Sequence, residues 1–215
     1  MQINDKQIRR RGALFIVSGP SGAGKTSVCA PALRQLEDVE MSVSHTTRTK
    51  RVGESDGIDY CFVADAEFTR MVDAGEFAEW AEVHGFRYGT SKRMIESARS
   101  AGRDLLLDVD VQGAEQLKRL YPDAVTIFLL PPSSHGLEQR LRRRGTDSHD
   151  TVGARLRNAC KEIERLASYD YVIVNDRLEA AVATFLAIVR AERARVSRII
   201  SDDLVALCRS FDQPK

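Results

Sequence analysis

Apolar and polar residues alternate in blocks along this chain of 215 residues. Short apolar runs recur at residues 14–17, 105–107, 126–130 and 171–174, and stretches with helical periodicity separate them. Short apolar runs are typical of strands buried on both faces of a parallel sheet, and the helices between them supply the crossover connections. The pattern therefore predicts an α/β fold built from βαβ units.

Two helices can be located from their ends. The first should begin directly after Gly24 and run toward Leu36. Asp176 followed by Glu179 resembles a capping box that opens a late helix. The apolar stripe of this helix comprises Leu178, Val182, Phe185, Leu186 and Val189, and its other face carries Arg190, Glu192, Arg193 and Arg195. A charged face of this kind predicts a solvated surface.

Two segments interrupt the alternation of strands and helices. Residues 45–90 contain five glycines, short strand-like pieces and many polar and aromatic residues, which predicts a small inserted lobe. Residues 140–155 are rich in arginine, contain Gly145 and Gly153 and lack a strong apolar face. We expect this second segment to be a mobile lid hinged on the core.

Composition narrows the class of protein. The chain is 43% hydrophobic and 29% charged, with a formal net charge of +1, so no global attraction to nucleic acid or anionic lipid is expected. The N-terminus has no apolar signal core, and no apolar stretch approaches the length of a membrane span. The four cysteines are scattered, which favours reduced thiols. We expect a cytoplasmic protein without nucleic-acid or membrane partners; the sequence leaves its oligomeric state open, a homo-oligomer included.

The most informative motif follows the first apolar run. It has the spacing G-x-x-x-x-G-K-[ST] of a phosphate-binding loop and comprises Gly19, Pro20, Ser21, Gly22, Ala23, Gly24, Lys25 and Thr26. Glycines allow backbone N–H groups to turn toward phosphates, the lysine adds a positive charge, and the threonine hydroxyl can hold Mg²⁺. The alternative is a plain glycine turn between strand and helix. A phosphate loop alone also fits GTPases, motor-type ATPases, nucleotide kinases and nucleotide-binding modules.

Residues 44–51 point to a second substrate. This segment, SHTTRTKR, places Arg48 and Arg51 three residues apart among hydroxyl side chains, a composition suited to a second phosphate. Together with GPSGAGKT at 19–26, GIDY at 57–60, EFAEWAEVHGFRYGTS at 76–91, LDVDVQG at 107–113, RLRRRGTDS at 140–148 and VIVND at 172–176, it closely resembles the guanylate kinase family. The signatures stand in the family's order and cover most of the chain.

The resemblance implies a P-loop NTPase-type parallel sheet flanked by helices, with an inserted GMP-binding lobe and a helical lid. It divides the chain into an N-terminal tail (1–11), a core (12–44, 91–139 and 157–215), the lobe (45–90) and the lid (140–156). It also implies transfer of the γ-phosphoryl group of ATP to GMP or dGMP, with Mg²⁺ as cofactor.

The resemblance also assigns roles to residues. Lys25, Arg48, Arg140, Arg144 and Arg155 would be catalytic. The phosphate loop and Asn175 would bind ATP. GMP would be bound by Ser44, Arg48, Arg51, Tyr60, Glu79, Tyr88, Thr90 and Asp108, and the metal by Thr26, Asp108 and Asp110.

The chemistry agrees with this assignment. The second pKa of a phosphate monoester is about 6, so the attacking GMP oxygen is largely ionised at neutral pH and needs no general base. Catalysis then depends on positioning and charge, which lysine and arginine supply without a His or Cys constellation. Two alternatives remain: an inactive interaction module of guanylate-kinase fold, and a related kinase with another phosphorylated acceptor. The intact phosphate loop argues against the first, and Ser44 and Glu79 argue against the second.

Overall fold

A five-stranded parallel sheet forms the core of the computed structural model, which describes residues 9–83, 85–143, 149–200, 205 and 208–209. Across the sheet the strands are β2 (Val39–Met41), β7 (Asp104–Asp108), β1 (Leu14–Ser18), β8 (Val125–Leu130) and β9 (Tyr171–Val174). The predicted α/β fold class and its four apolar runs are confirmed. Strand β2 was not predicted, because this edge strand has no fully buried residue and therefore no apolar run.

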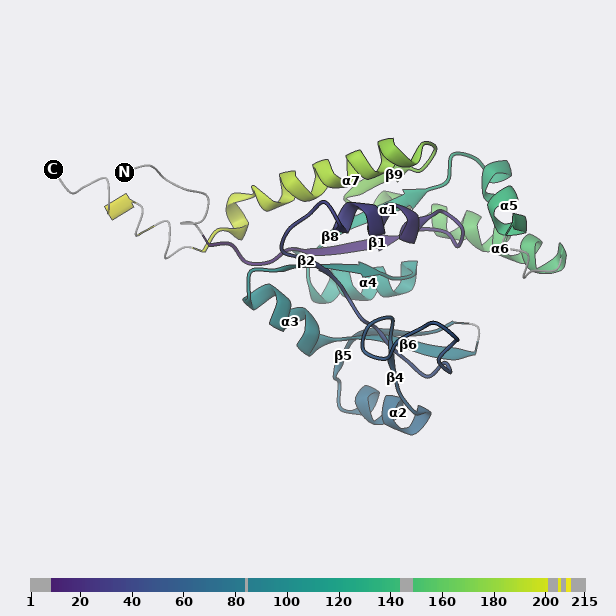
Figure 1. Cartoon of the computed structure of the whole chain (residues 1–215), viewed down its shortest axis with the longest axis horizontal. Helices are drawn as coiled ribbons and strands as arrows, with labels where there is room; N and C mark the ends of the chain where they lie inside the picture. Colours follow the sequence, from purple (N-terminus) through teal and green to yellow (C-terminus); the bar gives the residue numbers. More distant parts are fainter. Residues whose placement is uncertain (1–8, 84, 144–148, 201–204, 206–207, 210–215) are drawn as a thin grey trace.

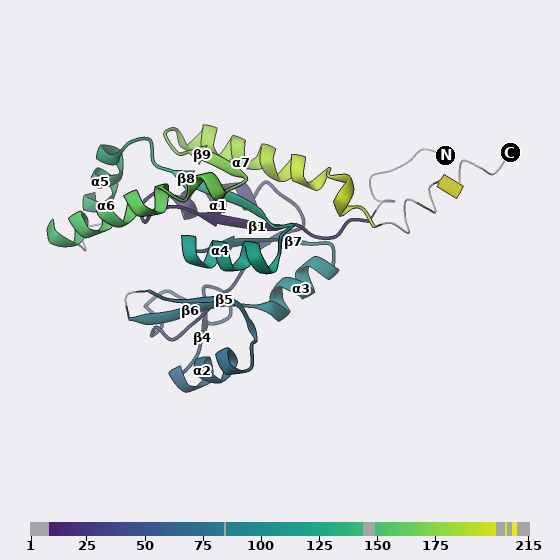
Figure 2. The same cartoon turned by 180° about the vertical axis from the view of Figure 1, so that it is seen from behind.

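Helices cover both faces of this sheet (Figures 1 and 2). On one face α1 (Lys25–Leu33) and α7 (Leu178–Arg193) pack against Phe15 and Val17. On the other, α3 (Lys92–Ser100) and α4 (Val111–Leu120) pack against Leu14 and Ile16. Alternate residues of β1 thus enter opposite layers, as expected of a central strand. None of the described helices is long and apolar enough to cross a membrane.

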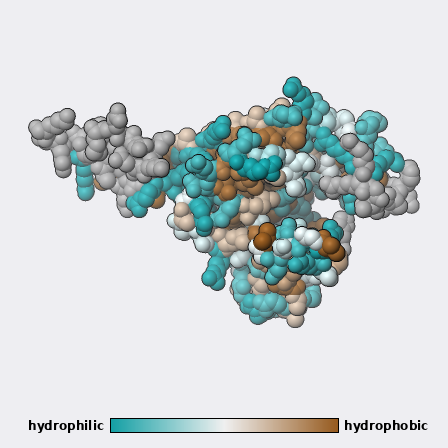
Figure 3. All heavy atoms as spheres, in the orientation of Figure 1, coloured by the Kyte–Doolittle hydropathy of each residue, from teal (hydrophilic) through white to brown (hydrophobic). Residues whose placement is uncertain are grey.

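Residues 45–91, which we call the small lobe, form a second sheet. Its order is β4 (Cys61–Phe62), β3 (His45–Thr46), β6 (Phe86–Ser91) and β5 (Phe77–Val83). Helix α2 (Asp65–Asp73) packs Phe68 and Met71 against Phe77 and so supplies a separate apolar cluster. The lobe lies on the α3–α4 side of the core in both views. The surface is hollowed between the lobe and helices α5 and α6 (Figure 3).

Helices α5 (Ser134–Arg143) and α6 (His149–Ile163) project from one end of the core (Figure 1). Their contact contains Leu137, Leu141, Val152 and Ala159, with Leu156 packed against them. Only Leu141 and Val152 of this cluster lie within residues 140–155, and the other members lie outside that stretch. The apolar contact is divided between α5 and the 15-residue α6, so only the packing of the two helices reveals it.

The start of α7 also differs from expectation. Its N-cap is Arg177, and no side chain caps the helix, so the predicted capping box of Asp176 and Glu179 is wrong. The Asn175 N–H still pairs with the Leu130 carbonyl at 2.8 Å. Asp176 therefore follows directly on the sheet and stands one residue too early to cap the helix. The apolar stripe is buried as predicted except at Leu178, which is exposed.

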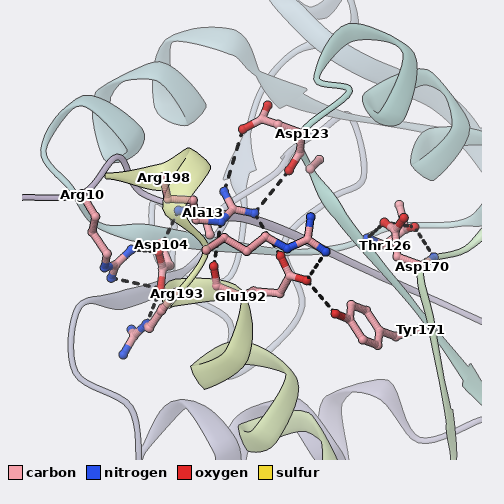
Figure 4. A network of polar contacts seen from close by, with 12 residues as sticks. Arg10, Ala13, Asp104, Asp123, Thr126, Asp170, Tyr171, Glu192, Arg193 and Arg198 are labelled. Atoms are coloured by element: carbon pink, nitrogen blue, oxygen red, sulfur yellow. Dashed lines mark hydrogen bonds and ion pairs between the residues drawn. The ribbon is translucent and has the colours of Figure 1, made fainter. Parts of the chain in front are cut away.

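The polar face of α7 joins a buried ionic network (Figure 4). Glu192 is only 1% exposed, accepts a 2.6 Å hydrogen bond from the Tyr171 hydroxyl and pairs with Arg198. Arg193 donates to Asp104 at 2.7 Å, and Arg10 pairs with the same carboxylate. The prediction of a solvated face is wrong for Glu192 and Arg193, because their partners come from distant parts of the chain.

This network has a structural position distinct from the phosphate loop. Asp104 begins β7 and Asp108 ends it. In a parallel sheet the network therefore lies at the amino-terminal ends of the strands and the phosphate loop at their carboxyl-terminal ends. Next to the network, the Arg11 N–H donates to the Arg198 carbonyl at 2.8 Å. The two ends of the described main chain are thereby fastened to the amino-terminal edge of the sheet.

Candidate active site

The loop at 19–26 connects β1 to α1 and requires its glycines. Gly19, Gly22 and Gly24 have φ values of 142°, 90° and 95°, a region that favours glycine. A Cβ atom on Gly19 would lie 2.3 Å from the Leu129 carbonyl oxygen, and one on Gly24 would lie 2.4 Å from Asn175 Nδ2. The loop is therefore wound tightly against the ends of β8 and β9, at the amino terminus of α1.

Lys25 faces the end of the neighbouring strand β7. Its Nζ donates to the Gly19 carbonyl at 2.8 Å and lies 3.8 Å from Asp108 Oδ1. Burial raises the pKa of Asp108 above its ordinary value, and the Lys25 ammonium opposes that rise. The arrangement places a cation and a carboxylate side by side at the carboxyl edge of the sheet, where α/β proteins bind their ligands.

Three oxygen-bearing side chains near this point were predicted to hold metal. Thr26 lies exposed in the first turn of α1, and Asp108 lies beside Lys25. Asp110 caps α4, with Oδ1 accepting from the Gly113 N–H at 2.8 Å. Among the described residues there is no group of three or more His, Cys, Asp or Glu side chains that could hold a metal ion. The two carboxylates and the hydroxyl of Thr26 are nevertheless donors that suit Mg²⁺, because this ion is commonly held by one or two carboxylates together with substrate phosphates.

Asn175 and Arg140 form hydrogen bonds that hold the phosphate loop in place. Asn175 Nδ2 donates to the Ala23 carbonyl at 2.7 Å, and Arg140 donates to the same oxygen at 3.2 Å and to the Asn175 carbonyl at 2.8 Å. A Cβ atom on Gly22 would come within 3.1 Å of Leu137 and Leu141. Helix α5 thus packs directly on the phosphate loop. Arg155 lies half-buried in α6, and Arg144 lies outside the described residues.

The small lobe contributes a second, arginine-centred group. Arg48 is only 8% exposed and donates to both carboxylate oxygens of Glu54, at 3.0 and 2.7 Å. Its guanidinium lies 5.3 Å from the centre of the Tyr60 ring, and the Tyr60 and Tyr88 rings are 5.9 Å apart. The exposed Arg51 joins the group through its backbone N–H, which donates to Glu54 at 2.8 Å. The structure therefore brings Arg48, Tyr60 and Tyr88 together and leaves the Arg51 side chain at the rim.

Glu79 is the buried carboxylate of the small lobe. It lies on β5 opposite Thr90 of β6, whose hydroxyl donates to Glu79 Oε1 at 2.6 Å. The side chain is only 6% exposed, and burial raises the pKa of Glu79 to about 7, although the Thr90 hydrogen bond opposes the rise. Ser44 is half-buried just before β3, and its carbonyl accepts from the Cys61 N–H at 2.9 Å.

Two residues of the site were not predicted from the sequence. Glu54 orients Arg48 and holds the backbone of Arg51. Glu162 of α6 is half-buried, and burial raises its pKa, an effect that the Lys25 charge opposes. The signal for Glu54 was a lone carboxylate a few residues after two arginines; Glu162 had no local signal, because it reaches the site only through the packing of α6.

Comparisons with known proteins agree with this geometry. A family model described as guanylate kinase matches residues 11–192. A guanylate kinase from Syntrophotalea carbinolica is 52% identical over 195 residues, covering 91% of this chain and 93% of that protein. One from Geobacter sulfurreducens is 48% identical over 205 residues, covering 95% and 100%.

A solved structure shows the same likeness. The crystal structure of guanylate kinase from Anaplasma phagocytophilum superimposes with a TM-score of 0.76 at 34% identity, covering 97% of this chain and 100% of that one. Sequence and structure agree over nearly the whole length. On this evidence the chain belongs to the guanylate kinase family.

Proposed function

We propose that this chain is an ATP:GMP phosphotransferase that transfers the γ-phosphoryl group of ATP to GMP or dGMP and yields ADP and GDP or dGDP. The reaction belongs to purine nucleotide metabolism. The observation that carries the proposal is the pairing of a complete phosphate loop with a lobe that holds both a buried arginine and a buried carboxylate. A phosphorylated acceptor with a hydrogen-bond-donating base requires these two groups.

ATP would bind along the phosphate loop. Its phosphates would lie at the amino terminus of α1, where backbone N–H groups and the helix dipole favour negative charge. Lys25 would stabilise charge on the transferring group, and Asn175 would lie near the adenine. Arg140, Arg144 and Arg155 would approach the same phosphates from α5, α6 and the segment between them.

GMP would bind in the small lobe. Arg48, Arg51, Tyr60 and Tyr88 would hold its phosphate, since a planar guanidinium matches phosphate geometry. Ser44, Glu79 and Thr90 would recognise guanine. Guanine presents two adjacent donors, N1–H and the N2 amino group, and an ionised carboxylate can accept from both. Adenine has an acceptor at N1 and would place a lone pair against Glu79.

The reaction itself requires positioning more than acid–base chemistry. The GMP phosphate is largely ionised at neutral pH, so no side chain needs to remove a proton from the attacking oxygen. Thr26, Asp108 and Asp110 would hold Mg²⁺, which offsets the charge of the ATP phosphates when bound. Lys25 and the arginines would keep donor and acceptor phosphates in line and exclude water.

The proposal includes the setting of the reaction. We infer a cytoplasmic enzyme that acts on small molecules, with no nucleic-acid or membrane partner, in keeping with the net charge of +1. Residues 45–90 would serve as the GMP-binding lobe and residues 140–156 as the lid that closes over both substrates.

A coupled ADP-release assay with ATP and each of AMP, CMP, UMP, GMP and dGMP tests the proposal. We expect GMP and dGMP to be the efficient acceptors and AMP to be very poor. Equal rates with AMP and GMP, or ADP release that is independent of any acceptor, would contradict it.

A further inference from the structure

Helix α4 belongs to the core and strand β5 to the small lobe, yet the two elements pack against each other. A Cβ atom on Gly113 of α4 would lie 2.9 Å from Glu79 Oε2. It would also lie 3.3 Å from Val109 Cβ and 3.4 Å from Asp110 Oδ1. A contact of 2.9 Å is shorter than carbon and oxygen tolerate, so only a residue without a side chain lets the carboxylate come this close to the helix.

Glu79 has little room to move away. Its other oxygen, Oε1, is held at 2.6 Å by the Thr90 hydroxyl, and the side chain is buried. One turn further along α4, the Gln116 side-chain amide forms two long hydrogen bonds of 3.4 Å with the backbone N–H and carbonyl of Trp80. Helix α4 therefore contacts β5 at Glu79 and at the residue after it.

The backbone does not explain the glycine. Gly113 lies inside α4 and is not among the glycines with positive φ. Gly113 is the third residue of the helix, and alanine is the better helix former by up to about 1 kcal/mol, so helix formation does not require glycine here. What distinguishes the position is the side chain it faces.

We propose that Gly113 is a specificity-determining positioning residue, whose missing side chain lets helix α4 set the position of the Glu79 carboxylate against the guanine of the acceptor. The inference rests on the proposed function, specifically on Glu79 as the group that accepts from guanine. Because α4 starts directly after Asp108 and Asp110, the same helix joins the base-reading carboxylate to the phosphate end of the site.

The first test is Gly113→Ala. Misplacement of a substrate-binding group by about 1 Å can cost up to about 100-fold, so we expect kcat/KM for GMP to fall roughly 10- to 100-fold. The KM for ATP should stay within about twofold, because the phosphate loop is anchored elsewhere. The melting temperature should fall by no more than a few degrees, because the better helix propensity of alanine offsets part of the cost of displacing Glu79. Gln112→Ala, an exposed neighbour on the same helix, is the matched control and should change kcat/KM for GMP less than about threefold.

A double-mutant cycle separates positioning from a general structural role. Glu79→Asp shortens the side chain by one methylene and withdraws the carboxylate from α4, which leaves room for the added methyl group. We expect the loss in Gly113→Ala/Glu79→Asp to be at least about threefold smaller than the product of the two single losses. Losses that simply multiply would overturn the positioning role.

The outcomes distinguish this inference from the proposed function. Wild-type protein that phosphorylates GMP, together with Gly113→Ala within about threefold of it, would overturn the inference and leave the function intact. Wild-type protein that does not phosphorylate GMP would refute the function, and the inference with it. A fall in GMP efficiency matched by an equal rise in the KM for ATP would also overturn the inference, since it would show a general distortion.

Discussion

The two halves of the site are held in different ways. On the phosphate-loop side the anchors are backbone carbonyls: Lys25 donates to Gly19, and Asn175 and Arg140 donate to Ala23. On the small-lobe side the anchors are side chains: Arg48 is held by Glu54, and Glu79 by Thr90. Two side-chain donors reach the same Ala23 carbonyl, so the loss of one leaves the loop held by the other. A site built from paired side chains can be altered one residue at a time, so we expect selectivity for the acceptor to depend on the small lobe.

Lys25→Met should impair the phosphate-loop half of the site and cause the largest loss of turnover. Loss of a cation that stabilises transition-state charge in a dry site costs about 3–4 kcal/mol, which lowers turnover by at least about 100-fold. Steady-state ADP release measures it. Lys161→Met, which removes an exposed lysine of α6, is the control and should stay close to wild type. A Lys25→Met variant with more than about a tenth of wild-type turnover would show that Lys25 is not catalytic.

The same contrast explains what could be predicted from the sequence. The phosphate loop is a run of consecutive residues whose glycines, lysine and threonine have fixed spacing, and its neighbours β1 and α1 follow from local patterns. Strands β7 and β8 were also predicted, because strands buried on both faces are largely apolar. The edge strand β9 was predicted from its apolar run although Val172 and Val174 are exposed. These features depend on residues close together in the chain.

The remaining features depend on contacts between distant residues. Gly113 and Glu79 are in contact although they are 34 residues apart in the sequence. Glu192 is buried where it pairs with Tyr171 and Arg198. A helical stripe of charges gives no sign of such partners, so the prediction of a solvated face was wrong for Glu192 and Arg193, although Arg190 and Arg195 are exposed. The role of Glu79 itself came from resemblance to a family, and its burial and anchoring came from the structure.

Glu79→Gln should impair GMP recognition in the small lobe and leave ATP binding unchanged. The substitution turns one acceptor into a donor aimed at a guanine donor, at a cost of about 2–4 kcal/mol, or about 30- to 1000-fold in kcat/KM for GMP. The KM for ATP should be nearly unchanged, because the phosphate loop is a separate site. Steady-state kinetics with each substrate varied in turn measures both. An efficiency with GMP within about threefold of wild type would refute the role of Glu79.

Glu54→Gln should weaken the same half more mildly. The change removes the charge that holds Arg48 in place, and a hydrogen bond to a charged acceptor is stronger than one to a neutral acceptor. Some orientation survives through Tyr60 and the Thr49 carbonyl, so we expect the KM for GMP to rise by only about 3- to 10-fold.

Glu67→Gln is the matched control for Glu54. Glu67 forms a similar ion pair with Arg70 in the same lobe, but both side chains are about half exposed. Exposed pairs contribute little, so this variant should stay within about twofold. Tighter GMP binding in Glu54→Gln would instead show that Glu54 competes with the acceptor phosphate for Arg48.

The smallest effect is a pH dependence that only the small lobe should show. Burial raises the pKa of Glu79 to about 7, whereas guanine requires the ionised form. Between pH 6.5 and 7.5 the ionised fraction grows about threefold, so GMP affinity measured by calorimetry should rise by about that factor. The raised pKa of Glu79 also affects the stability of the free protein. The contribution of Glu79 to the free energy of unfolding is fully present below pH 4.5, the ordinary pKa of a glutamate, and is lost as the pH rises through 7.

Glu79→Gln separates this titration from that of the ligand. The ionised fraction of the GMP phosphate, whose pKa is about 6, rises by only about a quarter over the same interval. The variant should keep that small slope in GMP affinity and lose the rest, while ATP affinity should show no difference in pH dependence between the two proteins. An identical slope in GMP affinity for wild type and variant would mean that Glu79 is already ionised in the free protein, and that the lobe presents guanine with a carboxylate ready to accept.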